Sequence, residues 1–218
     1  MTSTLNMNQL LVAIEETLYM SFGSLVYATI FGLLLGTLLY ATQKDSLVPN
    51  VLINRILDTI VNIFRSIPFI ILLFLLFPIT KKLVGSILGA SAAIPALSIT
   101  ATAFYARMCG IALNEVDKGT IEASKAMGAS RWQIIYKVLL PEAAPAIVSG
   151  IALTAINLIG YTTMAGAIGS GGLGNLAYLY GFARRNNLVL FTATIIIVVI
   201  VFVVQFIGDY ISRRIDKR

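Results

Sequence analysis

The sequence predicts an all-α integral membrane protein with five transmembrane helices. Of its 218 residues, 58% are hydrophobic and 12% are charged, whereas soluble domains carry about 25% charged residues. Uncharged runs cover residues 17–43, 83–106, 143–183 and 186–208, and each exceeds the roughly 20 residues that cross a bilayer core. The chain holds no His and one Cys, which excludes a His-based acid–base or metal site and an internal disulfide.

The first transmembrane helix is expected at about residues 18–40. Gly32 and Gly36 in this run form a small-xxx-small pattern, which allows a second helix to approach closely. That helix could belong to another copy of the chain or to the same chain. Residues 1–9 before the helix are expected to form an extracytoplasmic tail.

The second transmembrane helix is expected at about residues 53–77, and its first half is amphipathic. Polar residues recur there at helical spacing and share one face: Asn54, Arg55, Asp58, Thr59, Asn62, Arg65 and Ser66. The apolar run 67–77 alone would give only about 16 Å of helix, so the span must include part of the polar stripe. In a bilayer this stripe must face other helices or a water-filled cavity; the alternative is a helix lying on the membrane surface.

The third transmembrane helix is expected at about residues 87–105. Pro95 should kink this helix, because its ring removes one backbone hydrogen bond. Neighbouring groups or the Ser98 hydroxyl are expected to satisfy the freed carbonyl.

The last two transmembrane helices are expected at about residues 146–164 and 188–207. Between them, residues 166–181 are too rich in glycine for a good helix. We therefore expect a loop or re-entrant turn at the far face of the membrane, followed by a short helix. Residues 210–218 are expected to form a basic cytoplasmic tail.

The longest charged connection runs from Glu122 to Pro141, with the sequence EASKAMGASRWQIIYKVLLP. It predicts two short helices joined at Gly128, because glycine commonly ends a helix. Ser130 and Gln133 have the spacing of a capping box at the start of the second helix. That helix is expected to stop near Pro141, whose ring blocks the helical path.

This connection resembles the cytoplasmic EAA loop of ABC-transporter permeases. The matching positions are Glu122, Ala123, Ser124, Gly128, Val138, Leu140 and Pro141, with Ser124 and Val138 as small departures from the pattern. In that family the loop, within residues 115–141 here, forms a coupling helix that docks on the ATP-binding subunit. The resemblance therefore implies that Glu122, Ala123, Ser124, Met127 and Gly128 couple this chain to an ATPase. From composition alone, a solvated helical loop is the alternative.

Further segments resemble the permease subunits of bacterial methionine importers. They are VNIFRSIPFIILL at 61–73, KVLLPEA at 137–143, the run 161–174 and QFIGD at 205–209. The resemblance covers about residues 10–209 as one permease domain. It implies a subunit of the bacterial inner membrane that translocates L- or D-methionine by alternating access.

The same resemblance implies the partners. They are two ATP-binding cassette subunits, which would hold ATP and Mg²⁺, a second copy of this chain, and an extracytoplasmic methionine-binding protein. The sequence contains no G-x-x-x-x-G-K-[ST] phosphate-binding loop, so neither a cofactor nor an enzymatic activity is expected on this chain. No nucleic-acid partner is expected, since basic residues are usual at the cytoplasmic edge of a membrane protein.

Five residues are predicted to line the substrate pathway: Asn62, Arg65, Asn157, Tyr161 and Met164. Polar side chains within spans either join helices or line a path, and a methionine side chain offers a flexible apolar contact for a thioether. Ordinary helix packing is the alternative for each of these residues.

The distribution of basic residues predicts an N-terminus outside and a C-terminus inside. With five spans, ten basic residues fall on the side of the 122–141 loop: Lys44, Arg107, Lys118, Lys125, Arg131, Lys137, Arg213, Arg214, Lys217 and Arg218. Four fall on the other side: Lys81, Lys82, Arg184 and Arg185. Basic residues favour the cytoplasmic side, where an ATP-binding partner would lie.

An ion-coupled carrier and a membrane scaffold are the alternatives to an ABC permease. An ion-coupled carrier usually places ionisable groups in mid-span, but the expected spans hold none, except at the ends of the second. A membrane scaffold would need neither the polar stripe nor the EAA spacing. Among ABC permeases, another amino acid or small solute is the alternative substrate.

Overall fold

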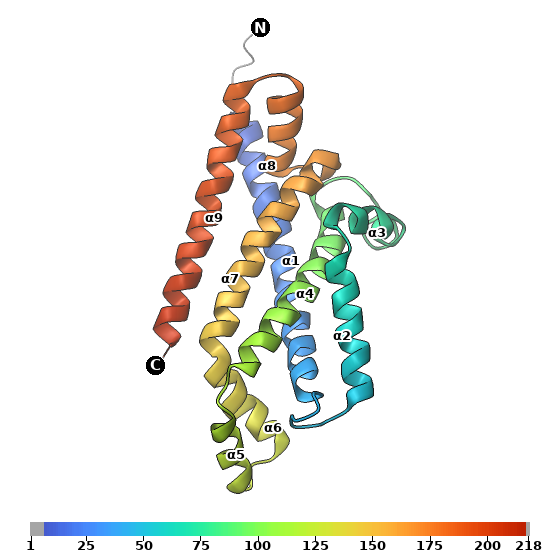
Figure 1. Ribbon diagram of the computed structural model, residues 1–218. Coiled ribbons are helices and arrows are strands. Elements are labelled where there is room, and N and C mark those ends of the chain that lie inside the picture. The colour runs from blue at the N-terminus through green and yellow to red at the C-terminus, as the bar shows by residue number, and fades with distance from the viewer. Residues whose placement is uncertain (1–6, 217–218) are drawn as a thin grey trace.

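The computed structural model describes residues 7–216, and every element in that part of the chain is helical (Figure 1). The long helices are α1 (Met7–Ala41), α4 (Ala90–Asn114), α7 (Leu140–Ala165) and α9 (Asn187–Ile215). The shorter ones are α2 (Val51–Ser66), α3 (Phe69–Val84), α5 (Lys118–Ala126), α6 (Arg131–Ile134) and α8 (Gly172–Asn175). Three π-helical segments, Ile135–Leu139, Gly166–Ser170 and Leu176–Ala183, complete the described chain.

Four helical stretches are long and apolar enough to cross a membrane, and the bent pair α2–α3 brings the number to five. The first, fourth and fifth predicted spans lie inside α1, α7 and α9. The third overlaps α4, which begins three residues later than expected and continues to Asn114. Residues 1–6 and 217–218 of the predicted tails lie outside the described residues, while residues 7–9 and 210–215 continue α1 and α9.

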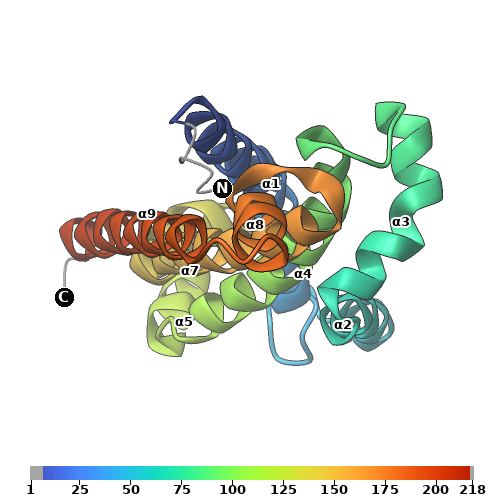
Figure 2. The same cartoon turned by 90° about the horizontal axis from the view of Figure 1, so that it is seen from above.

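The prediction of one continuous second helix at residues 53–77 was wrong. The axis bends by 106° between α2 and α3. Ile67 is extended, with φ −77° and ψ 122°, because the residue before a proline is driven out of the helical region. Pro68 then starts α3, and Figure 2 shows α3 turning away from the axis of α2.

Two further local predictions needed correction. The Ser98 hydroxyl is buried without a hydrogen-bond partner among the described residues, so it does not satisfy the carbonyl freed by Pro95. The glycine-rich segment has the expected turn followed by a helix, but it is more helical than expected: non-helical backbone is found at Ile168, Gly169, Gly171 and Gly172, and helical turns then continue to Ala183. Close packing outweighs glycine's poor helix propensity there, since a Cβ on Gly174 would collide with the backbone of Thr163.

Helices α1 and α4 cross at very short range through the small-xxx-small pattern. A Cβ on Gly32 would lie 2.8 Å from Cδ1 of Tyr105, and a Cβ on Gly36 would lie 2.5 Å from Cβ of Cys109 and 2.6 Å from the carbonyl oxygen of Ala106. The pattern therefore serves packing within the chain.

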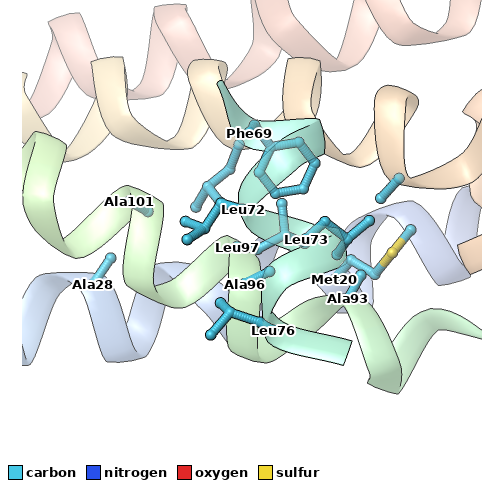
Figure 3. Packing of buried hydrophobic residues seen from close by; sticks show 12 residues of the cluster. Met20, Ala28, Phe69, Leu72, Leu73, Leu76, Ala93, Ala96, Leu97 and Ala101 are labelled. Atoms are coloured by element: carbon cyan, nitrogen blue, oxygen red, sulfur yellow. The ribbon is translucent and has the colours of Figure 1, made fainter. Parts of the chain in front are cut away.

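The apolar core lies where α3 folds back against α4 and α1. Phe69, Leu72 and Leu73 of α3 pack against Leu97 of α4 and Met20 of α1 (Figure 3). Alanines 93, 96 and 101 keep the facing surface of α4 shallow, which lets the larger α3 side chains approach. The bend at Pro68 thus places an apolar helix against the bundle rather than in line with α2.

We expect Gly36→Ala to destabilise the protein, because the added methyl group must push α1 away from α4. Overpacking of this kind costs about 1–3 kcal/mol. The matched control is Gly110→Ala in α4, where a Cβ meets no atom within 4 Å. Thermal unfolding of the purified protein in detergent should show a lower Tm for Gly36→Ala only. Equal Tm values for the two variants would contradict this account of the crossing.

Candidate functional site

The connection between residues 122 and 141 has the predicted break between two helices at Gly128. Helix α5 ends at Ala126 with Met127 as its C-cap, and Gly128 takes a left-handed conformation with φ +80°. The Gly128 N–H donates to the Lys125 carbonyl at 3.0 Å, and the Ala129 N–H donates to the Ser124 carbonyl at 3.1 Å. Glycine at this position avoids the strain that a side chain would cause in left-handed backbone.

The capping box at the start of α6 is confirmed. The Ser130 N–H donates to Oε1 of Gln133 at 2.7 Å, and the Gln133 N–H donates to Oγ of Ser130 at 3.3 Å. Both hydrogen bonds satisfy backbone donors that the first helical turn leaves open.

The predicted stop near Pro141 was wrong. Helix α6 passes through the π-helical turn Ile135–Leu139 directly into α7, so that residues 131–170 form one helical stretch. Pro141 directly follows this π-helical turn, and local π-helical adjustments accommodate the missing N–H of a proline inside a membrane helix. A π-helical insertion of this kind is common at functional sites. The connection is therefore joined to a membrane-spanning helix without a flexible linker.

One side of α5 and α6 is anchored to the bundle. Ile121 and Ile134 belong to an apolar cluster with Leu113 and Leu139, and the buried Ser124 hydroxyl donates to the Thr120 carbonyl at 2.8 Å. Of the predicted coupling residues, only Ser124 lies on this inner side.

The opposite side of α5 and α6 is exposed and partly apolar. Met127 and Trp132 are 82% and 77% exposed, and Glu122, Ala123 and Gly128 are exposed beside them. Figure 1 shows α5 and α6 protruding at the end of the bundle opposite to the start of α1. Exposed methionine and aromatic side chains are typical of the core of a protein interface.

A cavity of 460 Å³ lies where the α2–α3 bend meets α4 and α7. It is lined by residues 65–70 of the bend, by Thr100 and Phe104 of α4, and by Tyr161 and Met164 of α7. The rings of Phe69 and Tyr161 stack with centroids 5.0 Å apart and an interplanar angle of 24°. The structure therefore brings together three of the five predicted pathway residues, namely Arg65, Tyr161 and Met164.

The other two predicted pathway residues do not line this cavity. Asn62 is exposed one turn before Ser66, and its amide donates to Oδ2 of Asp58 at 2.9 Å. Asn157 is half-buried one turn before Tyr161. The sequence did not identify Phe69, Thr100 and Phe104 as lining residues, because single residues within apolar runs form no recognisable motif.

The polar stripe of α2 is only partly buried against other helices. The Asn54 amide donates to the Leu39 carbonyl at 2.7 Å and to Oγ1 of Thr42 at 3.0 Å. Asp58 pairs with Arg107 of α4 at 3.4 Å. The rest of the stripe, including Arg65, is exposed.

A second set of contacts closes the end of the bundle far from α5. The Gly172 N–H donates to Oε2 of Glu16 at 2.6 Å, and the Leu173 N–H donates to Oγ1 of Thr17 at 2.8 Å. Two side chains of α1 thus cap the helical segment that starts at Gly172. Nothing in the sequence pattern singled out this pairing across the chain.

Comparison with known proteins gives one family. Residues 28–217 match the family of binding-protein-dependent transport system inner membrane components. The chain is 56% identical over 213 residues to the methionine import system permease protein MetP of Bacillus subtilis, covering 98% of this chain and 96% of that protein. It is 49% identical over 203 residues to a probable D-methionine transport system permease protein, MetI, of Pasteurella multocida, covering 93% and 94% of the two chains.

A solved structure of the MetNI methionine ABC transporter in inward-facing conformations superposes on this chain with a TM-score of 0.95. The sequence identity is 45%, and the match covers 97% of this chain and 98% of that one.

We expect Ser130→Ala to loosen the start of α6, because loss of a helix N-cap costs about 1 kcal/mol, or roughly fivefold in local opening. Hydrogen exchange followed by mass spectrometry should show faster exchange in residues 130–136 only. The control is Thr120→Ala in α5, which keeps the backbone carbonyl that Ser124 uses. Unchanged exchange in Ser130→Ala would show that the capping box does not hold this helix.

Proposed function

Because the chain belongs to the binding-protein-dependent transport system inner membrane components, we propose that it is the permease subunit of an ATP-driven methionine importer. It would sit in the bacterial inner membrane and move L- or D-methionine across it by alternating access. The relatives named above support methionine as the substrate. The alternative substrate is another amino acid, and the transport experiment below distinguishes it from methionine.

The exposed surface of α5 and α6 carries the proposal. Glu122, Ala123, Met127 and Gly128 are all accessible, whereas Ser124 is buried on the side of α5 that faces the bundle. We infer that the exposed surface docks on a separate ATPase subunit. Because α6 is continuous with α7, a displacement of the ATPase would be transmitted to a transmembrane helix that lines the cavity.

The proposed assembly holds two copies of this chain, two ATP-binding subunits and an extracytoplasmic methionine-binding protein. Up to five spans per copy are few for enclosing a solute path, and two copies would enclose one between them. ATP and Mg²⁺ would be bound by the ATPase subunits. ATP binding drives the change of state only if the nucleotide binds one conformation more tightly than the other.

The basic residues support an orientation with α5 and α6 in the cytoplasm. Figure 1 shows that the C-terminal end of α9 points toward the end of the bundle that carries α5 and α6, whereas α1 starts at the other end. Arg213 and Arg214 in the last turn of α9 then add to the positive charge on the cytoplasmic side, as the charge rule favours.

The 460 Å³ cavity is the proposed position of methionine in the membrane. The Arg65 guanidinium would attract the substrate carboxylate, since charge-assisted hydrogen bonds of this type are strong. Tyr161 and Met164 would contact the thioether side chain. Asn62 and Asn157, each one turn earlier in its helix than the cavity lining, would extend the path beyond the cavity.

The proposed function is tested by reconstitution of this chain in proteoliposomes with the ATPase subunit and binding protein encoded beside it. We expect ATP-dependent accumulation of labelled methionine, which excess unlabelled methionine abolishes. ATPase activity that the binding protein stimulates, without methionine uptake, would support an ABC permease but show that methionine is not its substrate. Methionine uptake without any ATPase subunit would show that ATP hydrolysis does not drive the transport.

We expect Gly128→Asp to abolish transport while the protein remains in the membrane. A Cβ at Gly128 meets no atom of this chain within 4 Å, but any side chain is strained at φ +80°. The loss beyond this strain would arise from a carboxylate forced against the docked partner without compensation. Gly128→Asn is the matched control, because asparagine has nearly the same shape, carries no charge and tolerates left-handed backbone. Uptake and co-purification of the ATPase should fall more in Gly128→Asp than in Gly128→Asn. Full uptake by a well-expressed Gly128→Asp variant would contradict the proposal that this surface docks on the ATPase.

A further inference from the structure

A second and larger cavity, of 720 Å³, lies on the other side of α4 from the proposed path. Its walls come from Tyr27 and Phe31 of α1, Phe64 of α2, Leu83 of α3, and Ile94 and Thr102 of α4. We call this cavity the lateral groove. No residue with an ionisable carboxylate, ammonium or guanidinium group lines it. A cavity lined in this way holds water poorly and favours an apolar occupant.

The lateral groove opens to the outside of the bundle. Phe31 and Leu83 line it and are 52% and 71% exposed. On α4, Ser98 and Thr102 face the groove, whereas Thr100 and Phe104 face the 460 Å³ cavity. Each residue of the first set lies two positions from one of the second set. Two positions correspond to about 200° around the helix, so the two sets face nearly opposite directions. If two copies flank the path at Arg65, the groove therefore faces lipid.

The groove is elongated along α4. Its lining on that helix runs from Ser91 to Ala103, which is about 18 Å at 1.5 Å per residue. This length is more than half of the roughly 30 Å hydrocarbon core. An extended hydrocarbon chain fits such a shape better than a compact solute does.

Positive charge lies at one end of the groove. Leu83 and Val84 line the groove, and residues 85–89 join them to the start of α4, where Ser91 also lines it. Lys81 and Lys82 directly precede them in the last turn of α3. Both lysines are exposed. Basic residues beside an apolar pocket attract anionic lipid headgroups, because each adds a favourable charge interaction at the membrane surface.

From the elongated apolar lining and the two lysines at its end, we propose that the lateral groove is a binding site for an anionic phospholipid. One acyl chain lies along α4 between α1 and α2, and the headgroup phosphate pairs with Lys81 and Lys82. The bound chain supports α2 on the side away from the substrate path. The site does not depend on which solute the protein transports.

The site is tested on the complete transporter purified in mild detergent, with phosphatidylglycerol that carries a photoreactive diazirine in one acyl chain. After irradiation, digestion and mass spectrometry, we expect adducts concentrated on groove residues such as Phe31, Phe64 and Ile94. Phosphatidylethanolamine with the same acyl chains should label these positions about tenfold less. Adducts spread evenly over the exposed face of α9 would indicate bulk lipid only and would overturn the proposal.

Two substitutions at one position separate filling of the groove from loss of its hydroxyl. Ser98→Phe should fill the groove and reduce the adducts at least fivefold, whereas Ser98→Ala should leave them unchanged. If Ser98→Phe does not fold, Thr102→Phe tests the same point. Undiminished labelling in a folded Phe variant would contradict the site.

The role of the lysines is tested by the double variant Lys81→Gln and Lys82→Gln, with Arg184→Gln and Arg185→Gln as the control for charge at the same side of the membrane. The lysine variant should label equally with the two lipids, while the arginine variant should keep the preference for phosphatidylglycerol. A preference that survives in the lysine variant would overturn the proposed headgroup contact.

Discussion

The short-range crossing of α1 and α4 is the constraint on which the rest of the structure depends. Gly32 and Gly36 leave no room for a Cβ against Tyr105, Ala106 and Cys109. Close approach of this kind supplies van der Waals contact, which holds helices together in lipid where no hydrophobic force does. With α1 fixed against α4, helices α2, α3 and α7 pack on α4, and α9 packs on α7.

Helix α4 then separates surfaces with different tasks. One side closes the cavity of Arg65, Tyr161 and Met164, and another forms the lateral groove. Its C-terminal end leads into α5, whose residue Ile121 packs in one apolar cluster with Ile134 of α6. Because α6 continues into α7, the exposed face of α5 and α6 is connected through continuous helix to the wall of the 460 Å³ cavity. Coupling between the two sites needs such a connection of packed or continuous elements.

Much of this arrangement was predictable from local sequence. Charge-free runs located four spans, and short-range patterns gave the Gly128 break and the Ser130–Gln133 capping box. The bend at Pro68 was missed although Ile67-Pro68 carries the signal, because the length of one span was given more weight than the proline. The continuity of α6 and α7 was not predicted, because the π-helical turn 135–139 that accommodates Pro141 has no sequence signal of its own. The Glu16 and Thr17 caps join residues 156 positions apart, and no local pattern encodes such a contact.

The central claim is that the exposed face of α5 and α6 docks on an ATPase subunit, and site-specific photo-crosslinking tests it most directly. A photoreactive amino acid would replace Met127 in the assembled transporter, with Tyr210 of α9 replaced in a parallel sample. The account predicts that position 127 forms a covalent adduct with the ATPase subunit in high yield and that position 210 does not. An assembled, active transporter in which position 127 gives no ATPase adduct would contradict it.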